Sequence, residues 1–416
     1  VSHAQVQIET WTTQAGTKVL FTQAPQLPML DIEVTFDGGS ARDNKDYGLA
    51  NFAAGLIGMQ TKSLNEDQIA EGFNKIGAQF GGDAGRDKSS FSLRTLTRQP
   101  NQRQAIKQFV EVLAQAEFPV EIFERERKRL QTSLQQKAVK PNAISTDLLW
   151  QKLYGDHPYS HPVSGTPESL QALTPKKIEQ FYQQYYVASN AVIAMVGDID
   201  VAQAKQISEH ISSKLLKGSK AKPIVPVTPL KKSKEHIQEF SSSQTHFSMA
   251  QVGVERGHPD YIPLFLGNHL FGGGGFGSYL MEEVREKRGL VYSVYSYFAP
   301  MRQKGPFVIG LSTSNVTARD AQKVVTDTLL AFLTDFDQER FEASKSNLVG
   351  GFPLRMDSNS KKLGYLSLIG FYDLPLDYLE WFPQQVAKTT KQQVIDAWQR
   401  HVKPNTMLTL MVGQPE

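Results

Sequence analysis

The sequence of 416 residues contains no cysteine, and this absence excludes several kinds of chemistry at once. Without thiol groups the chain can form no disulfide framework, no thiolate zinc site, no iron–sulfur cluster and no cysteine nucleophile. Long hydrophobic runs are missing too. The longest, such as residues 191–196, fall far short of the roughly 18 residues that a transmembrane helix needs. We therefore expect no membrane-spanning segment.

A strong excess of charge of one sign is also lacking. The chain has 45 Lys and Arg residues against 42 Asp and Glu residues, which leaves an evenly spread formal net charge of +3. This balance does not indicate nucleic acid or an acidic lipid surface as a partner. Hydrophobic residues make up 40% of the chain, as in an ordinary globular protein, and its length indicates two or three domains.

An internal repeat divides the chain into two halves. Residues 174–197 and 390–413 align without a gap, and each copy begins with Thr and ends with Met-Val-Gly. The pattern in each copy is that of an amphipathic helix followed by a buried strand. We therefore predict an N-terminal domain of residues 1–216 and a C-terminal domain of residues 235–416.

The segment between the two halves, residues 217–234, has six Lys, three Pro and no acidic residue. Prolines keep such a segment extended and like charges repel each other, so we interpret it as a linker that crosses the surface. A docking patch for a partner is the alternative interpretation of this basic run.

Local patterns predict strands and helices in the same order in both halves. In the first half, apolar residues alternate over 30–36 as in a half-buried strand, and a helix follows over 48–59. Ser63 followed by Glu66 is a capping box, which predicts the start of a second helix. In the second half we expect strands around 247–254 and 307–311, and helices around 261–271 and from 318 onward.

This order favours an α+β fold with two homologous α/β-roll halves. In each half we expect a mixed or antiparallel sheet with helices on one side. Two such halves joined by a linker suggest a clamshell around a shared cavity.

A glycine-rich run in the second half carries a family resemblance. Residues 270–297 contain four consecutive glycines followed by Arg285 and Tyr292. This run resembles the C-terminal-half signature of the pitrilysin and mitochondrial-processing-peptidase superfamily, which are zinc metallopeptidases with an inverted H-x-x-E-H motif. His157-Pro-Tyr and Gly165-Thr-Pro fit the same family. The resemblance implies two homologous halves, and a peptide-sized chamber enclosed by two such chains or by one fused chain.

The first half departs from this family at its zinc motif. The two histidine positions of the motif are Asn51 and Gly55 here, and the general-base position is Ala54. These positions share one helix face, but Ala and Gly carry no ligand atom. A further ligand, a glutamate in active members, falls at Ser133 if Glu126 is the acid that precedes it by seven residues. We therefore expect no metal in this chain.

No other constellation replaces the lost motif. His157 and His161 are four residues apart, but Pro158 and Pro162 disfavour a shared helix, so we interpret the histidines as parts of a turn. The sequence has no G-x-S-x-G, and the glycine run is not followed by the Lys-Ser/Thr of a phosphate loop. A stand-alone hydrolase at another site therefore has no support.

The resemblance assigns a role to Arg285 and Tyr292. In the family, an Arg and a Tyr seven residues apart reach across the chamber to the substrate at the partner's metal. Arginine can hold a peptide carbonyl or carboxylate, and a tyrosine hydroxyl can donate to a developing oxyanion. The alternative is that Arg285 is one more solvated charge on its helix and that Tyr292 simply alternates with other tyrosines along a strand.

Substrate-binding candidates lie in the glycine run itself. Glycines allow a substrate backbone to approach closely, or they only relieve crowding before the next helix begins at Ser278. The candidates for substrate contact are Gly273, Gly274, Gly275 and Phe276.

The leading hypothesis is a non-catalytic subunit of a two-chain zinc metallopeptidase that is inactive alone. Its partner would be a homologous zinc-bearing chain in a heterodimer, or a second copy in a homodimer, and the substrates would be peptides. The alternative is a catalytically inert structural or peptide-holding scaffold of the same fold. Because the chain begins at Val1 rather than Met, we expect a periplasmic location, with mitochondrial and cytoplasmic locations as alternatives.

Overall fold

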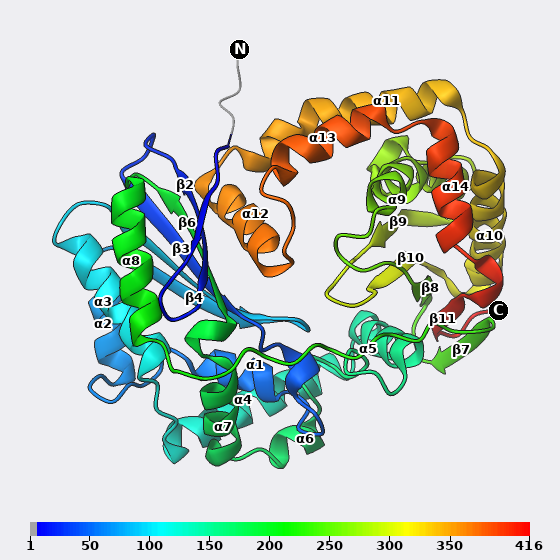
Figure 1. Cartoon of the computed structure of the whole chain (residues 1–416). Helices are drawn as coiled ribbons and strands as arrows, with labels where there is room; N and C mark the ends of the chain where they lie inside the picture. The colour runs from blue at the N-terminus through cyan, green and yellow to red at the C-terminus, as the bar shows by residue number, and fades with distance from the viewer. Residues whose placement is uncertain (1–5) are drawn as a thin grey trace. The chain divides into compact units, whose positions relative to one another are not determined.

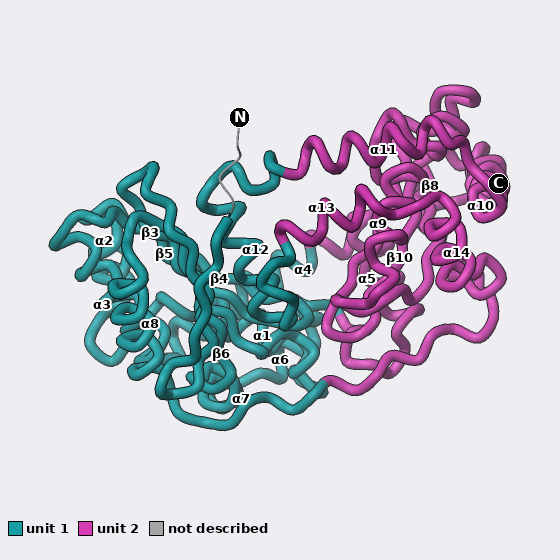
Figure 2. Tube along the Cα trace, turned by 45° about the horizontal axis from the view of Figure 1, so that its top comes forward, with its two compact units in different colours: residues 1–135, 162–223, 353–378 teal, residues 136–161, 224–352, 379–416 magenta. Residues whose placement is uncertain are grey.

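The computed structural model describes residues 6–416, which form two compact units (Figure 2). Unit 1 contains the described residues up to Gln135 together with Pro162–Pro223 and Pro353–Tyr378, and unit 2 contains Gln136–His161, Ile224–Phe352 and Leu379–Glu416. Both units are therefore discontinuous in the sequence. The boundary predicted at 217–234 separates the strands of the two sheets, but a helical segment from each half of the chain belongs to the other unit.

Unit 1 is built on a six-stranded mixed sheet with the order β1-β2-β6-β3-β5-β4 (Figure 1). Strands β2 and β6 are parallel, and all other neighbours are antiparallel. The strands are β1 (Glu9–Thr12), β2 (Lys18–Gln23), β3 (Met29–Phe36), β4 (Gln79–Ala84), β5 (Ser89–Leu96) and β6 (Ala191–Gly197).

Unit 2 is built on a five-stranded mixed sheet with the order β7-β11-β8-β10-β9. Only β7 and β11 are parallel. The strands β2–β6 and the strands β7–β11, matched one to one in chain order, occupy the same relative positions in their sheets. In each set the first and the last strand are paired in parallel. The strands are β7 (Lys234–Glu239), β8 (Gln244–Val252), β9 (Val291–Phe298), β10 (Pro306–Ser314) and β11 (Leu408–Gly413).

This shared topology confirms the predicted α+β fold with two homologous halves. The repeat is visible in atomic detail, because the Thr174 and Thr390 side chains cap equivalent helices by accepting hydrogen bonds from Lys177 N and Gln393 N. Those helices are α7 (Pro175–Tyr185) and α14 (Lys391–His401), and each precedes the last strand of its sheet.

Helices fill the remaining layers of both units. Those wholly or mainly in unit 1 are α1 (Leu49–Leu56), α2 (Glu66–Lys75), α3 (Asn101–Ala114), α4 (Val120–Lys137), α6 (Pro167–Gln171), α8 (Val201–Lys214) and α12 (Asn359–Phe371). Those of unit 2 include α5 (Pro141–Tyr154), α9 (Tyr261–Asn268), α10 (Ala318–Thr334), α11 (Gln338–Gly351) and α13 (Tyr378–Lys388). Within residues 6–416, no helix combines the length and apolar character needed to cross a lipid bilayer.

The capping box predicted at Ser63 and Glu66 is wrong by two residues. Helix α2 is capped by Asn65, whose side chain accepts from Gln68 N while the Gln68 side chain accepts from Asn65 N. Asn caps helices as well as Ser does, and Ser63 instead donates its hydroxyl hydrogen bond to the Glu111 carboxylate.

One helix in each unit comes from the other half of the chain and covers the second face of the sheet. In unit 1, Val19 and Phe21 belong to the main core, so Leu20 between them points to the opposite face. Gly370 of α12 packs on that face: a Cβ there would lie 2.6 Å from Leu20 Cδ1 and 2.7 Å from Val192 Cγ1. In unit 2, α5 contacts β8 and β11. Helices on one side of each sheet were predicted, and these two are additions to that arrangement.

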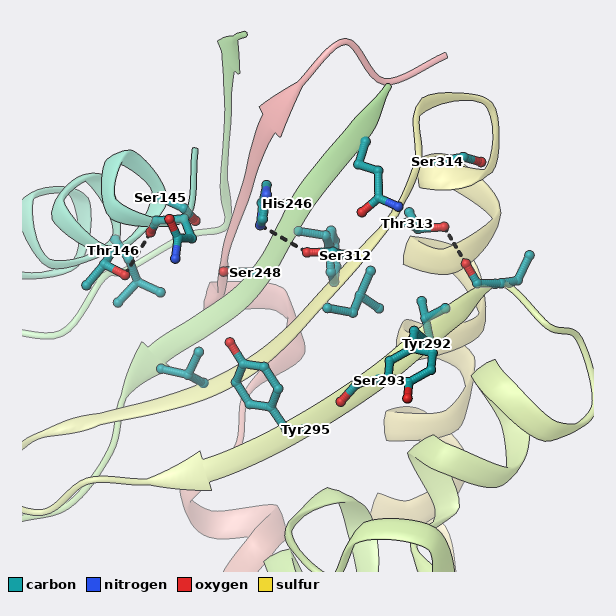
Figure 3. Close-up of a pocket in the computed structure, with 18 of the residues that line it drawn as sticks. Ser145, Thr146, His246, Ser248, Tyr292, Ser293, Tyr295, Ser312, Thr313 and Ser314 are labelled. Atoms are coloured by element: carbon teal, nitrogen blue, oxygen red, sulfur yellow. Dashed lines mark hydrogen bonds between the residues drawn. The ribbon is translucent and has the colours of Figure 1, made fainter. Parts of the chain in front are cut away.

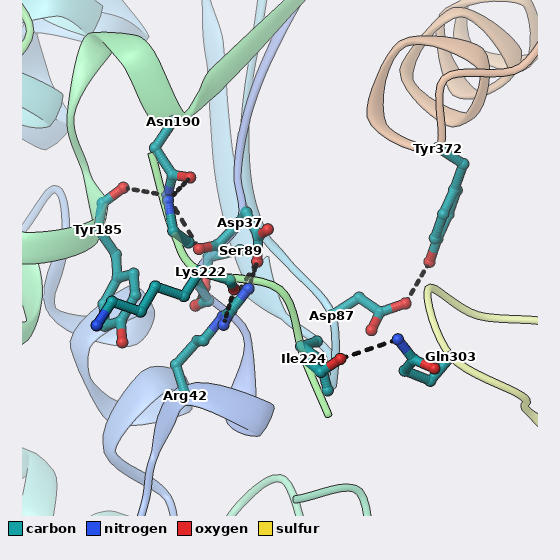
Figure 4. Close-up of polar contacts among 12 residues, drawn as sticks. Asp37, Arg42, Asp87, Ser89, Tyr185, Asn190, Lys222, Ile224, Gln303 and Tyr372 are labelled. Atoms are coloured by element: carbon teal, nitrogen blue, oxygen red, sulfur yellow. Dashed lines mark hydrogen bonds and ion pairs between the residues drawn. The ribbon is translucent and has the colours of Figure 1, made fainter. Parts of the chain in front are cut away.

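Side chains bind the backbone of the linker on both sides of the point, between Pro223 and Ile224, at which the chain passes from unit 1 to unit 2 (Figure 4). In unit 1, Arg42 Nη1 donates to Lys222 O at 2.6 Å. In unit 2, Gln303 Nε2 donates to Ile224 O at 2.9 Å, and His157 Nε2 donates to Val225 O at 2.8 Å. His157 Nδ1 accepts from the backbone of its own turn, as a structural histidine would.

The close fit of α12 on the first sheet generates a stability prediction. Gly370→Val should lower the free energy of unfolding by about 1–3 kcal/mol, because its new methyl groups would overlap Leu20 and Val192. The matched control is Gly364→Val on the same helix, where a Cβ would meet no atom within 4 Å. Urea unfolding followed by circular dichroism measures both, and equal shifts of the two midpoints would contradict this packing.

Candidate functional site

Helix α1 is well formed but carries almost no donor atoms. Asp43 holds its first turn, accepting from Gly48 N at 2.9 Å and from Ala50 N at 2.8 Å. Asn51 is the only polar side chain of the helix, and it is half-buried. Ala54 is buried, whereas a Cβ at Gly55 would meet no atom within 4 Å. The helix therefore has space for a larger side chain at Gly55 but no ligand set for a metal.

Glu126, the acidic residue expected on α4, forms ion pairs with two arginines. Glu126 is buried, with 6% of its surface exposed, and its carboxylate pairs with Arg125 at 3.2 Å and with Arg129 at 3.0 Å. Ser133 lies on the same helix seven residues later and is exposed. The residues present in α1 and α4 do not fit a catalytic zinc ion, which needs three protein ligands and an open position.

A second group of possible metal ligands lies in unit 2. Within the described residues, His258, Asp260 and His401 bring their ligand atoms within 4.8 Å of one another. The Asp260 carboxylate, however, already binds His401 Nε2 at 2.7 Å and Arg400 at 2.9 and 3.2 Å. His258 Nδ1 accepts a hydrogen bond from Asp260 N at 3.0 Å, which puts the proton of the neutral ring on Nε2. We interpret the group as a polar network that joins the start of α9 to the end of α14.

Arg285 and Tyr292 lie against each other. The Arg285 guanidinium is 5.1 Å from the centre of the Tyr292 ring and 4.8 Å from the centre of the Phe276 ring. Both rings are exposed, Tyr292 by 85% and Phe276 by 70%. Cation–π contacts of this kind hold a guanidinium in place while leaving its N–H groups free. The structure thus brings together three residues that were predicted from the sequence.

Most of the other charged residues around Arg285 are paired without it. Glu283 binds Lys287 at 2.6 Å and Arg288 at 2.8 Å. Glu282 binds Lys287 at 3.0 Å and Arg340 at 2.6 Å. No ion pair among the described residues includes Arg285 or Glu286, so Arg285 differs in this respect from the neighbouring cations Lys287 and Arg288.

A β-bulge turns the Tyr292 side chain outward. Leu311 pairs with Val294 and Thr313 pairs with Val291, so that Tyr292 and Ser293 together lie opposite Ser312. Val294 and Ser296 are buried, and regular alternation would place Tyr292 on their face. The extra residue reverses the alternation, and both Tyr292 and Ser293 are exposed.

The glycine run packs tightly against its surroundings. A Cβ would lie 2.3 Å from Ser296 Oγ at Gly272, 2.5 Å from Asn268 Nδ2 at Gly273 and 2.5 Å from His269 O at Gly274. Gly275 has a φ of +67°, which favours glycine. Relief of crowding therefore accounts for Gly272, Gly273 and Gly274, and backbone conformation accounts for Gly275. Substrate contact by Gly273, Gly274, Gly275 and Phe276 stays a prediction.

Both flanks of the run are π-helical, over His269–Gly273 and over Met281–Glu286. Arg340 of α11 binds the segment that follows the four glycines. It donates a hydrogen bond to Gly277 O at 3.1 Å, and its guanidinium lies 3.8 Å from the centre of the Tyr279 ring. π-helical turns are rare and occur often at functional sites.

A cavity of about 840 Å³ opens on one face of the second sheet (Figure 3). Tyr292, Ser293 and Tyr295 of β9 line it together with His246 and Ser248 of β8, and α5 contributes Ser145 and Thr146. Sequence reasoning missed this cavity because α5 belongs to the other half of the chain. The signal that could have revealed its floor is the alternation of polar residues at 244, 246, 248 and at 312, 314.

Comparisons with known proteins agree on one family. Residues 18–167 match the model described as insulinase (peptidase family M16), and residues 172–348 match that of the peptidase M16 inactive domain. A crystal structure of a peptidase M16 inactive domain from Pseudomonas fluorescens has a TM-score of 0.95 and 36% identity, covering 99% of this chain and 98% of that one.

Two curated bacterial relatives span most of the chain. A non-peptidase homolog, YmxG, from Helicobacter pylori is 24% identical over 410 residues, which are 96% of this chain and 92% of that protein. An uncharacterized zinc protease, also called YmxG, from Bacillus subtilis is 24% identical over 362 residues, 86% of each chain.

The ligand-poor α1 and the occupied carboxylate of Asp260 generate a prediction about metal. After exposure to zinc and dialysis into metal-free buffer, we expect less than about 0.1 zinc ion per chain by plasma emission spectroscopy. Stoichiometric zinc that Asn51→Ala removes would contradict our account of α1. Zinc that His401→Ala removes would contradict our account of the network in unit 2.

Proposed function

Because this chain belongs to peptidase family M16, the insulinase family, and has no zinc-binding motif, we propose that it is the non-catalytic subunit of a two-chain zinc metallopeptidase. Its partner in this role is a homologous chain with an intact motif, since a second copy of this chain in a homodimer would lack the same ligands. The partner supplies the zinc ion, its ligands and the general base. This chain supplies Arg285, Tyr292 and part of the surface that holds the peptide.

A single observation carries the proposal: Arg285 and Tyr292 lie against each other, with Tyr292 exposed and Arg285 half-buried, although α1 has no ligand set for a metal. Their ring-to-guanidinium distance of 5.1 Å and the 85% exposure of Tyr292 leave both polar ends open to a ligand. The bulge in β9 and the stacking of Arg285 on two rings fix these side chains without using their hydrogen-bonding groups.

The chemistry of the two side chains suits a peptide under attack by water. The planar, permanently charged guanidinium of Arg285 binds a peptide carbonyl or a terminal carboxylate. The Tyr292 hydroxyl donates a hydrogen bond to the oxygen that gains negative charge as the carbonyl is attacked. Neither group has to ionise or move a proton for this role, so both act by orientation and electrostatic stabilisation.

The peptide itself has an available backbone partner. Strand β9 forms the edge of the second sheet, so one row of its N–H and C=O groups is unpaired within the sheet. An extended segment that adds to such an edge is recognised through its backbone, largely independent of its sequence. Peptide binding and a periplasmic location both belong to this proposal.

A second candidate function is an inert scaffold of the same fold that holds peptides or other subunits without taking part in chemistry. The observation that favours it is the similarity to the Helicobacter pylori protein named a non-peptidase homolog. If the chain is such a scaffold, Arg285 and Tyr292 have no role in its function.

Mixing experiments separate the two functions. A purified homologue with an intact H-x-x-E-H motif should cleave a fluorogenic peptide much faster in the presence of this chain than alone. Each protein by itself should show only background cleavage. A homologue that is as fast alone as in the mixture would leave the scaffold as the better account.

Tyr292→Phe probes the proposed oxyanion donor directly. We expect kcat of the mixed complex to fall about 10²–10³-fold, the usual effect of removing one such donor, with the affinity between the subunits unchanged. Tyr261→Phe serves as the matched control, because Tyr261 lies on α9 and does not line the cavity. Full activity of Tyr292→Phe would remove this hydroxyl from the mechanism.

A further inference from the structure

We propose that the cavity on the second sheet selects peptide segments whose side chains are uncharged, and that it disfavours segments that carry Asp, Glu, Lys or Arg. The inference rests on the proposed function in taking a peptide as the ligand. It adds a substrate class and names the residues that determine it. The site lies entirely within unit 2.

The strand register defines the floor of the cavity. Ser248 lies opposite Gly310, and His246 lies opposite Ser312, so these four residues share one face of the sheet. Tyr295 pairs with Gly310 on the other side and lies across it, since a Cβ at Gly310 would be 2.4 Å from the Tyr295 hydroxyl. The absence of a side chain at Gly310 thus leaves room for the tyrosine ring.

The opposite face of the same strands is the apolar core. Met249, Phe307 and Ile309 alternate with the cavity residues and are buried. The cavity face is the second face of the sheet, which α5 covers mainly over β8 and β11, so charged side chains could still be accommodated beside β9 and β10. Of the 22 described residues that line the cavity, however, none is Asp, Glu, Lys or Arg, although such residues make up 21% of the chain.

Burial favours the neutral forms of two ionisable groups in the cavity, His246 and Tyr295. Burial lowers the pKa of His246 below its ordinary value, and its Nδ1 lies 3.0 Å from the Ser312 hydroxyl. Burial raises the pKa of Tyr295, so that its hydroxyl stays protonated. The lining residues themselves consequently offer no counter-charge to a ligand, and Arg285, which contacts Tyr292, is not among them.

Free hydroxyl groups supply the polar contacts instead. The side chains of Ser248, Ser293 and Tyr295 form no hydrogen bond to any other described residue, and all three line the cavity. A hydroxyl can donate or accept by rotating, so it suits both the N–H and the C=O groups of a peptide. Tyr295 and Tyr297 add apolar ring surface and stack with centroids 6.1 Å apart.

This lining is unsuited to other ligand classes. A nucleotide or phosphate usually binds to cationic side chains and a metal to carboxylates or several imidazoles, and the lining provides neither. A charged peptide side chain placed here would lose part of its hydration without gaining an ion pair, which weakens its binding. An uncharged segment loses little and keeps its backbone hydrogen bonds.

The test measures binding to the purified full chain without any partner. The probes are fluorescein-labelled octapeptides of Ser, Ala, Gln and Tyr, blocked at both ends, with two central residues kept uncharged or replaced by Glu or by Lys. Fluorescence anisotropy should give an affinity for the uncharged peptide at least about tenfold higher than for either charged peptide. Equal affinities for all three peptides, or no binding of the uncharged one, would overturn the proposal.

A charge placed in the wall should change the selectivity. Thr146→Lys should improve binding of the Glu peptide at least about fivefold and weaken that of the Lys peptide, and Thr146→Glu should do the reverse. Thr132→Lys is a closely matched control: both threonines are exposed on helices and donate to the carbonyl four residues earlier at 3.0 Å, but only Thr146 lines the cavity. The same response in both Lys variants would contradict a local effect.

Two further outcomes keep this inference separate from the proposed function. Selective binding by the lone chain, without acceleration of a zinc-bearing partner, would support the cavity and refute the catalytic role. Acceleration of the partner with equal binding of all three peptides would do the opposite. Displacement of the uncharged peptide by maltotriose at equal concentration would identify a carbohydrate site and overturn the inference.

Discussion

The extra residue that β9 carries opposite Ser312 is the constraint on which the proposed site depends. Without it, Tyr292 would follow Val294 and Ser296 into the core, and Arg285 would lose one of the two rings that it contacts. The same bulge places Tyr292 and Ser293 on the face where Tyr295 and Tyr297 line the cavity. One local irregularity in strand pairing thus connects a cation–π pair, an exposed hydroxyl and a binding surface. Bulges commonly redirect side chains beside functional sites, and the two π-helical turns next to it show how irregular the backbone of this region is.

The two units share one topology but differ in what their chemistry allows. In unit 1, the frame of the lost zinc site is intact: Asp43 still holds the first turn of α1, and the stacking of Phe52 on Phe123 at 4.8 Å still joins α1 to α4. These contacts serve folding and do not require a metal. In unit 2, Tyr292, Ser293 and Tyr295 are exposed at the site, and the side chains of Ser293 and Tyr295 form no hydrogen bond to another described residue. Stability therefore explains what unit 1 retains, whereas folding alone does not explain the exposed tyrosines and uncharged walls of unit 2.

Much of this architecture follows from local sequence patterns. The repeat predicted equivalent helices, and Thr174 and Thr390 do cap them, because capping depends on a few neighbouring residues. Where two cap residues were equally suitable, the pattern failed: Asn65 caps α2, while Ser63 is drawn to Glu111, a residue distant in the sequence. The loss of the zinc-site residues at Asn51, Ala54 and Gly55 could also be predicted from the sequence, because it depends only on which residues occupy these positions. The stacking of Arg285 between Phe276 and Tyr292, the bulge and the cavity were not, because they depend on strand register and on which sheet α5 covers.

The placement of α5 and α12 has a consequence for how this chain can be divided. Each helix covers a sheet made of strands from the other half of the chain, with Gly370 against Leu20 and Val192 in one case and α5 against β8 and β11 in the other. A gene fragment that ends within the linker would encode strands without the helix that shields their second face. Such a fragment would expose apolar side chains to water and be prone to aggregate. The two halves of this chain thus share a topology but are not independent folding modules, because the sheet of each half depends on a helix from the other half.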